Sequence, residues 1–215
     1  MNLSKRYMPQ FIETIKLFNG KFYRLELHQN RMNKVFEDHF KDDEKICLAE
    51  YVHASSFPKN GLYKCRIVFD STIRKLEYIP YEMRKIRSLR LLETDIDTLP
   101  YKKEDRSNLN DAFAKREHCD DVLLIKNSLL TDTSFCNIAL FDGHTWVTPR
   151  IPLIYGVNRA QLLAEGKIIE KDIKMDELAN FSSLRLFNAM VEFGECELTP
   201  YVIRKYNHQV SICTT

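Results

Sequence analysis

FIETIKLFNGKFYRLEL, residues 11–27, alternates bulky and polar side chains on both sides of Asn19-Gly20. Two alternating runs joined by Asn-Gly are the strongest short-range signal for a β-hairpin, because the tight turn needs positive φ angles that these residues tolerate. Beyond residue 28 the bulky residues change to helical spacing and stand at Met32, Val35, Phe36 and Phe40. The sequence therefore predicts a hairpin over residues 11–27 and then an amphipathic helix over residues 28–40.

Strand and helix patterns are mixed along the rest of the chain. Helices are predicted over residues 43–53, from Asp105 or Ser107 onward, and from Asn158 or Arg159 onward. Strands are predicted over residues 61–69, 75–81, 88–93, 122–125, 128–131, 137–141, 145–148 and 183–187, with a hairpin turn at Asp142-Gly143 and a helical turn over residues 176–180. This mixture indicates the α+β or α/β class.

The stretch TDIDTLP at residues 94–100 is short and polar and ends at a proline, which favours a joint between two domains. We therefore predict a small N-terminal α/β domain over residues 1–95, a linker over residues 96–101 and a C-terminal domain over residues 102–215. A cleft is expected where the domains meet, and ligands often bind in such places.

The charge of the chain is nearly balanced, with 32 Lys and Arg against 30 Asp and Glu among 215 residues. This balance disfavours a protein whose main task is to bind nucleic acid, so the basic cluster at residues 84–87 is expected to be a solvated face. No apolar run approaches about 18 residues, so we expect no membrane span. The six cysteines are scattered singly, which argues against a zinc or redox site and favours reduced thiols in the cytoplasm.

Two side chains stand where a cleft between domains would expose them. Lys102 comes directly after the predicted linker, although two adjacent lysines such as Lys102 and Lys103 are more often a solvated surface. Asp132 ends a predicted strand, a position that suits a carboxylate facing a cleft, although capping of the next turn would explain it as well. The residues alone leave both alternatives open.

Two further features suit a phosphate group. Arg31 follows His28 by three residues, so both lie on one side of the predicted helix, where a guanidinium can bind phosphate through two hydrogen bonds. A surface salt bridge is the equal alternative for this arginine. GVNR at residues 156–159 leads into a helix, whose free N–H groups and dipole favour an anion, although an ordinary loop-to-helix entry has the same pattern.

Taken in chain order, these features resemble the fold-type IV family of pyridoxal 5'-phosphate enzymes, which includes class IV aminotransferases and 4-amino-4-deoxychorismate lyases. The likeness runs from about residue 11 to about residue 194. FIETI, NGK and HQNR, which begin at residues 11, 19 and 28, resemble the opening strand, hairpin and phosphate-arginine helix of the family. KKEDR at residues 102–106 is similar to its Lys-x-x-Asn-Arg segment, and FNAM at residues 187–190 resembles the late Asn-Ala-Leu turn of the lyases.

This resemblance implies a two-domain fold similar to that of D-amino-acid aminotransferase, with a shortened N-terminal domain, and pyridoxal 5'-phosphate as the cofactor. Lys102 would bind the cofactor covalently and act as general base, while Asp132 would pair with the nitrogen of its ring. The residues expected to hold the phosphate or to close the site are Arg31, Val157, Asn158, Asn188 and Ala189. The family also implies a homodimer, and no metal site is expected.

The sequence departs from the family at three positions, since Asp132 replaces a glutamate, Asn158 a threonine and Asp105 an asparagine. Ser107 stands where branched-chain aminotransferases carry tyrosine, and the first half lacks the Arg-x-His segment of D-amino-acid aminotransferases. We therefore expect a 4-amino-4-deoxychorismate lyase of folate biosynthesis, which releases pyruvate by β-elimination and forms 4-aminobenzoate. The alternatives are a class IV aminotransferase for a small branched-chain or D-amino acid, and a family-derived protein without catalysis.

The substrate expected for the lyase is a small acidic amine. Arg66, Arg106 and Arg159 are candidates for binding its carboxylates, and the sequence does not rank them. Because the first domain shapes the substrate side of the cleft in this family, its shortness bears on the identity of the substrate and leaves the prediction of the cofactor unchanged.

Overall fold

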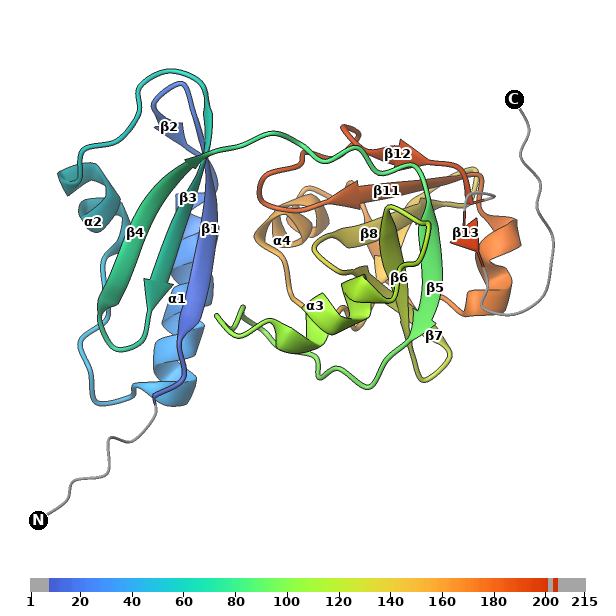
Figure 1. The fold of residues 1–215 in the computed structure, drawn as a ribbon, viewed down its shortest axis with the longest axis horizontal. Helices are drawn as coiled ribbons and strands as arrows, with labels where there is room; N and C mark the ends of the chain where they lie inside the picture. The colour runs from blue at the N-terminus through green and yellow to red at the C-terminus, as the bar shows by residue number, and fades with distance from the viewer. Residues whose placement is uncertain (1–7, 201–202, 205–215) are drawn as a thin grey trace, which may run out of the picture.

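The computed structural model describes residues 8–200 and 203–204, which form two parts lying side by side (Figure 1). The first part contains β1 (Phe11–Phe18), β2 (Lys21–Phe22), α1 (Leu25–His39), α2 (Leu48–Ala54), β3 (Leu62–Phe69) and β4 (Ile73–Pro80). The second part contains β5 (Leu89–Glu93), α3 (Ser107–Ala114), β6 (Asp121–Lys126), β7 (Leu129–Thr133), β8 (Asn137–Phe141), β9 (Trp146–Pro149), α4 (Val157–Ala164), β10 (Ile169–Lys171), the 3-10 helix η1 (Met175–Asn180), β11 (Ser183–Phe187), β12 (Glu197–Leu198) and β13 (Ile203–Arg204). The predicted mixture of helices and strands in both halves is confirmed.

An antiparallel sheet with the strand order β2-β1-β3-β4 forms the first part, and α1 packs against it. Phe11, Ile15 and Leu17 are fully buried along β1, because side chains at every second position share one face of a strand. They join a core with Met32 and Phe36 of α1. The apolar face of the strand, with a period of two residues, and the apolar face of the helix, with a period of 3.6 residues, therefore pack together in one layer.

The predicted hairpin turn is present between β1 and β2, with φ of 48° at Asn19 and 76° at Gly20. The second strand was predicted to reach residue 27, and this was wrong, because β2 ends at Phe22. Arg24 adopts a left-handed conformation with φ 57°, which turns the chain out of the sheet, and α1 begins directly after it. The helical period therefore starts earlier than the apolar residues alone indicated.

Two sheets pack face to face in the second part of the molecule. One has the strand order β13-β5-β6-β7 and the other β10-β9-β8-β11-β12. Their shared core contains apolar side chains of both sheets: Leu89, Leu91, Leu123, Ile125, Ile138, Leu140, Leu184 and Leu186. Leu109 of α3 packs on the other side of β6, and Leu162 of α4 packs beside Phe187 of β11, so each sheet also carries a helix.

The place of β5 differs from the predicted division of the chain. We placed residues 88–93 in the first domain, but β5 pairs in parallel with β6 from Leu89 to Glu93, so it belongs to the second part. The chain therefore crosses between the two parts after Pro80 and before Leu89 (Figure 1). The segment predicted as the linker lies along the junction instead, where Leu99 N donates to Leu153 O at 2.8 Å.

Smaller differences concern lengths. The helix predicted over residues 43–53 is confined to α2, which buries only Leu48 and Val52. The turn predicted over residues 176–180 forms η1, and Asp142-Gly143 lies between β8 and β9 as predicted. The cysteines that the structure describes are free thiols, and Cys213 lies outside the described residues. No helix within the described ranges is long and apolar enough to cross a membrane.

Candidate active site

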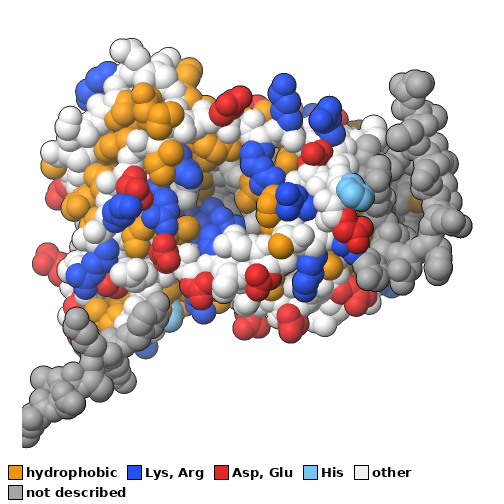
Figure 2. All heavy atoms as spheres, viewed as in Figure 1, with side chains coloured by type: hydrophobic (Ala, Val, Ile, Leu, Met, Phe, Trp, Pro, Cys, Tyr) orange, Lys and Arg blue, Asp and Glu red, His pale blue; other side chains and the backbone are white. Residues whose placement is uncertain are grey.

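A cavity of about 200 Å³ lies at the junction of the two parts. Lys and Arg side chains gather along this junction in the space-filling view (Figure 2). The walls come from α1, the segment before α3, the loop between β7 and β8, the start of α4 and the turn after β11. The predicted site residues that line it are Arg31, Lys102, Asp132, Val157, Asn188 and Ala189. The fold therefore brings together side chains from both parts of the chain.

Lys102 is fixed at the junction through its own backbone. Its carbonyl oxygen accepts the N–H of Ile12 at 3.0 Å, so β1 holds the segment that carries the lysine. Burial lowers the pKa of Lys102 to about 7, and the positive charges of Arg31 and Arg106 act in the same direction. Its amino group makes no hydrogen bond or ion pair with the residues that the structure describes. An amine that is partly neutral at pH 7 can act as a nucleophile or as a base.

Arg31 is anchored by Glu13, a buried carboxylate that the sequence analysis did not single out. Arg31 Nε donates to Glu13 Oε1 at 2.8 Å and Nη2 donates to Oε2 at 2.6 Å, while His28 Nδ1 also bonds Glu13. Burial alone would raise the pKa of Glu13, but Arg31 and His28 outweigh it and lower that pKa to about 2. Arg31 and Glu13 are 5% and 1% exposed, so the alternative of a surface salt bridge is wrong.

The signal that could have revealed Glu13 is its register in the strand. It stands between Phe11 and Ile15 on the face of β1 that is otherwise apolar. A charged residue in such a register needs a buried partner, and the helix over that face carries Arg31. The pair fixes the plane of the guanidinium and leaves its Nη1 group for a ligand in the cavity.

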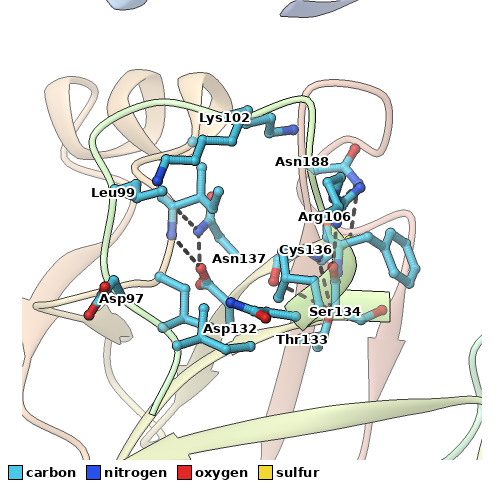
Figure 3. A pocket seen from close by; sticks show the side chains of 18 of the residues that line it. Asp97, Leu99, Lys102, Arg106, Asp132, Thr133, Ser134, Cys136, Asn137 and Asn188 are labelled. Atoms are coloured by element: carbon cyan, nitrogen blue, oxygen red, sulfur yellow. Dashed lines mark hydrogen bonds between the residues drawn. The ribbon is translucent and has the colours of Figure 1, made fainter. Parts of the chain in front are cut away.

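Asp132, near the end of β7, lies in another wall of the cavity together with Asn137 (Figure 3). Its Oδ1 accepts Asn137 Nδ2 at 2.9 Å and its Oδ2 accepts the N–H of Ile154 at 2.9 Å. Burial raises the pKa of Asp132 to about 6, although these hydrogen bonds act in the opposite direction. No Lys or Arg of the described residues forms an ion pair with it. This carboxylate is therefore suited to a positively charged atom of a ligand.

The start of α4 offers backbone N–H groups. The first helical hydrogen bond runs from Ala160 N to Gly156 O at 3.0 Å, so the N–H groups of Val157 and Asn158 have no acceptor within the helix. These groups form the positive end of the helix dipole. Gly156 and Val157 line the same cavity as Arg31, so the start of α4 and the Arg31 guanidinium can both bind one anion there.

Asn158, which is predicted to help hold the phosphate, uses its side chain to join two elements. Its Nδ2 donates to Asn188 O at 2.9 Å and to Val191 O at 3.1 Å. Asn188 Oδ1 in turn accepts the N–H groups of Met190 and Val191 at 2.7 and 3.0 Å. Asn158 therefore joins α4 to the turn after β11, and only its backbone N–H remains for a phosphate.

Asn137 was not among the predicted site residues. Besides Asp132, its Nδ2 bonds Ile154 O at 2.8 Å, so this amide organises the wall around the carboxylate. A Cβ atom on Gly156 would lie 2.0 Å from Asn137 Oδ1, and only glycine leaves room for the amide. Because Asn137 and Gly156 are distant in the chain, no local pattern in the sequence could have paired them.

The three arginines left open for substrate carboxylates now differ. Two of them form ion pairs: Arg66 with Glu77 and Glu104, and Arg159 with Glu170. Arg106 lines the cavity on the same side as Asn188 (Figure 3) and donates to Ser134 O at 2.6 Å. No carboxylate of the described residues forms an ion pair with it. Arg106 is therefore the candidate among the three with the most accessible charge for a ligand.

These groups fit pyridoxal 5'-phosphate. Its phosphate needs anion donors, which Arg31 and the start of α4 supply. Its ring nitrogen, when protonated, needs a carboxylate without a competing cation, and Asp132 meets that condition. Its aldehyde needs a neutral amine, which Lys102 provides near pH 7.

Comparisons with known proteins place the chain in a family. The family model for amino-transferase class IV matches residues 59–196. An uncharacterized protein of Haemophilus influenzae is 33% identical over 185 residues, which cover 85% of this chain and 98% of that protein. A crystal structure of a putative 4-amino-4-deoxychorismate lyase from Haemophilus somnus is 29% identical with a TM-score of 0.79, and the match covers 88% of this chain and 100% of that one.

A second crystal structure, of a putative amino-acid aminotransferase from Mesorhizobium loti, has the same fold. It is 22% identical with a TM-score of 0.76, and the match covers 88% of this chain and 98% of that one. The predicted family, the fold-type IV architecture and the cofactor are thereby confirmed. The chain belongs to the class IV aminotransferase family of enzymes, which depend on pyridoxal 5'-phosphate.

Proposed function

We propose that the protein is a 4-amino-4-deoxychorismate lyase that forms 4-aminobenzoate and pyruvate, a step of folate biosynthesis. The observation that carries this proposal is the turn at Asn188-Ala189, which resembles that of the lyases and lies in the wall of the cavity that also contains Lys102. The similarity to the Haemophilus somnus protein, over the whole of that chain, supports the same function.

The charges of the cavity suit this substrate. 4-Amino-4-deoxychorismate carries two carboxylates and one amino group, so it needs positive charge beyond that used by the phosphate of the cofactor. Arg106 is best placed to bind a carboxylate, since Arg66 and Arg159 are already paired with glutamates. The amino group of the substrate would react beside Lys102.

Lys102 is the residue expected to move protons in this reaction. The bound cofactor supplies an electron sink for the carbon that carries the substrate nitrogen. With its lowered pKa, Lys102 removes the proton from that carbon and then protonates the departing enolpyruvyl group, which leaves as pyruvate. Asp132 holds the positive charge of the ring nitrogen, and formation of the aromatic product drives the elimination forward.

A class IV aminotransferase is the second candidate, because the family model that matches most of the chain is that of the aminotransferases. The same Lys102 would then move a proton from the substrate carbon to the cofactor. Such an enzyme converts the cofactor to pyridoxamine 5'-phosphate when an amino acid alone is added, whereas a lyase does not.

The homodimer and the cytoplasmic location stay predictions. Sedimentation of the purified protein tests the homodimer.

Product analysis of matched variants tests the proposed function. The purified protein with pyridoxal 5'-phosphate is incubated with 4-amino-4-deoxychorismate, and 4-aminobenzoate and pyruvate are measured separately. We expect equal amounts of both products, lost in Lys102→Ala and retained in Lys103→Ala, whose side chain is exposed. Absence of 4-aminobenzoate with the loaded wild-type protein, together with pyridoxamine 5'-phosphate formed from an amino acid, would show the aminotransferase instead.

A further inference from the structure

Four side chains at the junction of the two parts form a cluster outside the cavity, which we call the junction clamp. Its members are Lys16, Arg24, Gln161 and Glu192. Arg24 Nε donates to Gln161 Oε1 at 2.5 Å, and both terminal nitrogens of Arg24 donate to Glu192, Nη1 at 3.2 Å. Lys16 Nζ donates to Glu192 Oε1 at 2.9 Å. The clamp therefore joins the first part of the molecule to the second.

The clamp differs from an ordinary surface ion pair in its burial. The side chains of Lys16 and Arg24 are 10% and 11% exposed, while that of Glu192 is 31% exposed. Arg24 also has φ 57°, a left-handed conformation that is unfavourable for a residue other than glycine. A strained arginine that makes three hydrogen bonds across an interface is held there by the surrounding structure.

Each end of the clamp lies near a group that binds the phosphate. Arg24, at the start of α1, lies about two helical turns before Arg31, which is about 10 Å along the helix axis, and the seven-residue spacing puts both on the same face. Gln161 is one turn beyond Val157 on α4. Glu192 directly follows Val191, whose carbonyl oxygen accepts the amide of Asn158. The clamp therefore connects α1 with α4 and with the turn after β11.

The pairing of Arg31 explains why such a connection matters. Arg31 is fixed to Glu13 within the first part, whereas the N–H groups of Val157 and Asn158 belong to the second part. A phosphate held by both needs the two parts at a fixed distance. Lys102, in contrast, is expected to react with the aldehyde, which is a separate substituent on the ring carbon next to the one that carries the phosphate arm.

We propose that Lys16, Arg24, Gln161 and Glu192 are positioning residues that set the affinity for the phosphate group of the cofactor by fixing α1 against α4. Loss of the clamp then weakens pyridoxal 5'-phosphate, which has a phosphate, and leaves pyridoxal, which has none, nearly unchanged. A residue that merely supports the fold would affect both compounds alike.

The test measures the two dissociation constants in the apoprotein without substrate, from the absorbance of the bound compound and the fluorescence of the single tryptophan, Trp146. For Glu192→Gln we expect the dissociation constant of pyridoxal 5'-phosphate to rise about tenfold and that of pyridoxal to change less than about twofold. Glu192→Asp, which keeps the charge, should restore part of the affinity. The position of the absorbance maximum should stay unchanged, because the surroundings of Lys102 are not altered.

Asp38→Asn is the matched control, since it removes an exposed ion pair with Lys34 from the same helix α1. It should change neither dissociation constant by more than about twofold. If Glu192→Gln does not fold, Arg24→Lys provides the same comparison, because lysine keeps the charge and loses the bond to Gln161. Equal changes for the two compounds, or none for either, would overturn the proposal. The measurement needs no substrate, so failure of the lyase assay does not affect it.

Discussion

Glu13 and Asp132 are two buried carboxylates, one in each part of the molecule, and their pKa values move in opposite directions. The pKa of Glu13 falls to about 2 and that of Asp132 rises to about 6, although burial acts on both in the same sense. The difference lies in their partners. Glu13 faces the cation Arg31, whereas the carboxylate oxygens of Asp132 accept only from the neutral groups of Asn137 and Ile154.

This contrast separates a structural carboxylate from one that is ready for a ligand. The charge of Glu13 is compensated within the protein, so its role is complete before the cofactor binds. The carboxylate of Asp132 has no cationic partner among the described residues, and a protonated ring nitrogen would supply one. Substitutions at the two positions should therefore affect different properties.

Glu13→Gln should have the largest effect on stability. It leaves Arg31 buried without its carboxylate, and breaking a buried pair from one side costs about 3–5 kcal/mol. The free energy of unfolding from urea titration measures this loss. Glu77→Gln, which affects half-buried pairs with Arg66 and Lys75, should cost less than about 1 kcal/mol. Equal losses in the two variants would contradict the assignment.

Asp132→Asn should mainly affect activity. Without a carboxylate opposite the ring nitrogen, we expect kcat of the loaded enzyme to fall about 10²–10³-fold. Its free energy of unfolding should fall less than that of Glu13→Gln, because the amide keeps an acceptor for one of the two donors. Asp142→Asn, in the exposed turn between β8 and β9, serves as the control and should keep its rate. A normal rate in Asp132→Asn would show that the carboxylate does not serve the ring.

The stability of the apoprotein should depend on pH through both carboxylates, with opposite signs. The lowered pKa of Glu13 gives stability that is present above about pH 4.5 and is lost as the pH falls toward 2. The raised pKa of Asp132 gives stability that is present below pH 3.8 and is lost as the pH rises through about 6, a loss of about 3 kcal/mol. Urea titrations between pH 3 and 8 should show this loss between about pH 4 and 6 in the wild type. That loss should be absent in Asp132→Asn, and its persistence there would assign the titration to another group.

Gly156→Ala should have the smallest effect of the four. Its Cβ atom would displace the Asn137 amide that positions Asp132, and overpacking of this kind costs about 1–3 kcal/mol. We expect weaker binding of pyridoxal 5'-phosphate as well, measured by titration of the apoprotein. Gly166→Ala serves as the control. The φ angle of Gly166 is 66° and an added Cβ atom would meet no other residue within 4 Å, so this change should add only backbone strain and leave cofactor affinity unchanged.

The sequence predicted much of this site because several of its signals are local. Asn19-Gly20 needs only its own φ angles to turn the chain, and Arg31 needs only the helical period to share a face with His28. Several short motifs taken in chain order, with the one around Lys102 among them, were sufficient together to identify the family. The contacts of the Asn158 side chain could not be predicted in this way, because its acceptors, Asn188 and Val191, lie about 30 residues away.

Partners of buried polar groups were beyond the reach of local patterns. The pairing of Glu13 with Arg31 requires β1 and α1 to pack, and the contact between Asn137 and Gly156 requires β8 to meet the start of α4. The same limit explains why β5 was placed in the wrong part. The alternation of apolar and polar residues indicates which face of a strand is buried, but it does not indicate which strand pairs with it.

By itself, the sequence determined the local conformations and the residue types available for the chemistry, because φ preferences and side-chain periods act between residues a few positions apart. Only the tertiary structure decided which of these side chains meet and which charges remain uncompensated. Their partners then separate the two buried carboxylates. Removal from water raises the pKa of Asp132, whereas the cation Arg31, which the fold places beside Glu13, outweighs the same effect there and helps to lower the pKa of Glu13.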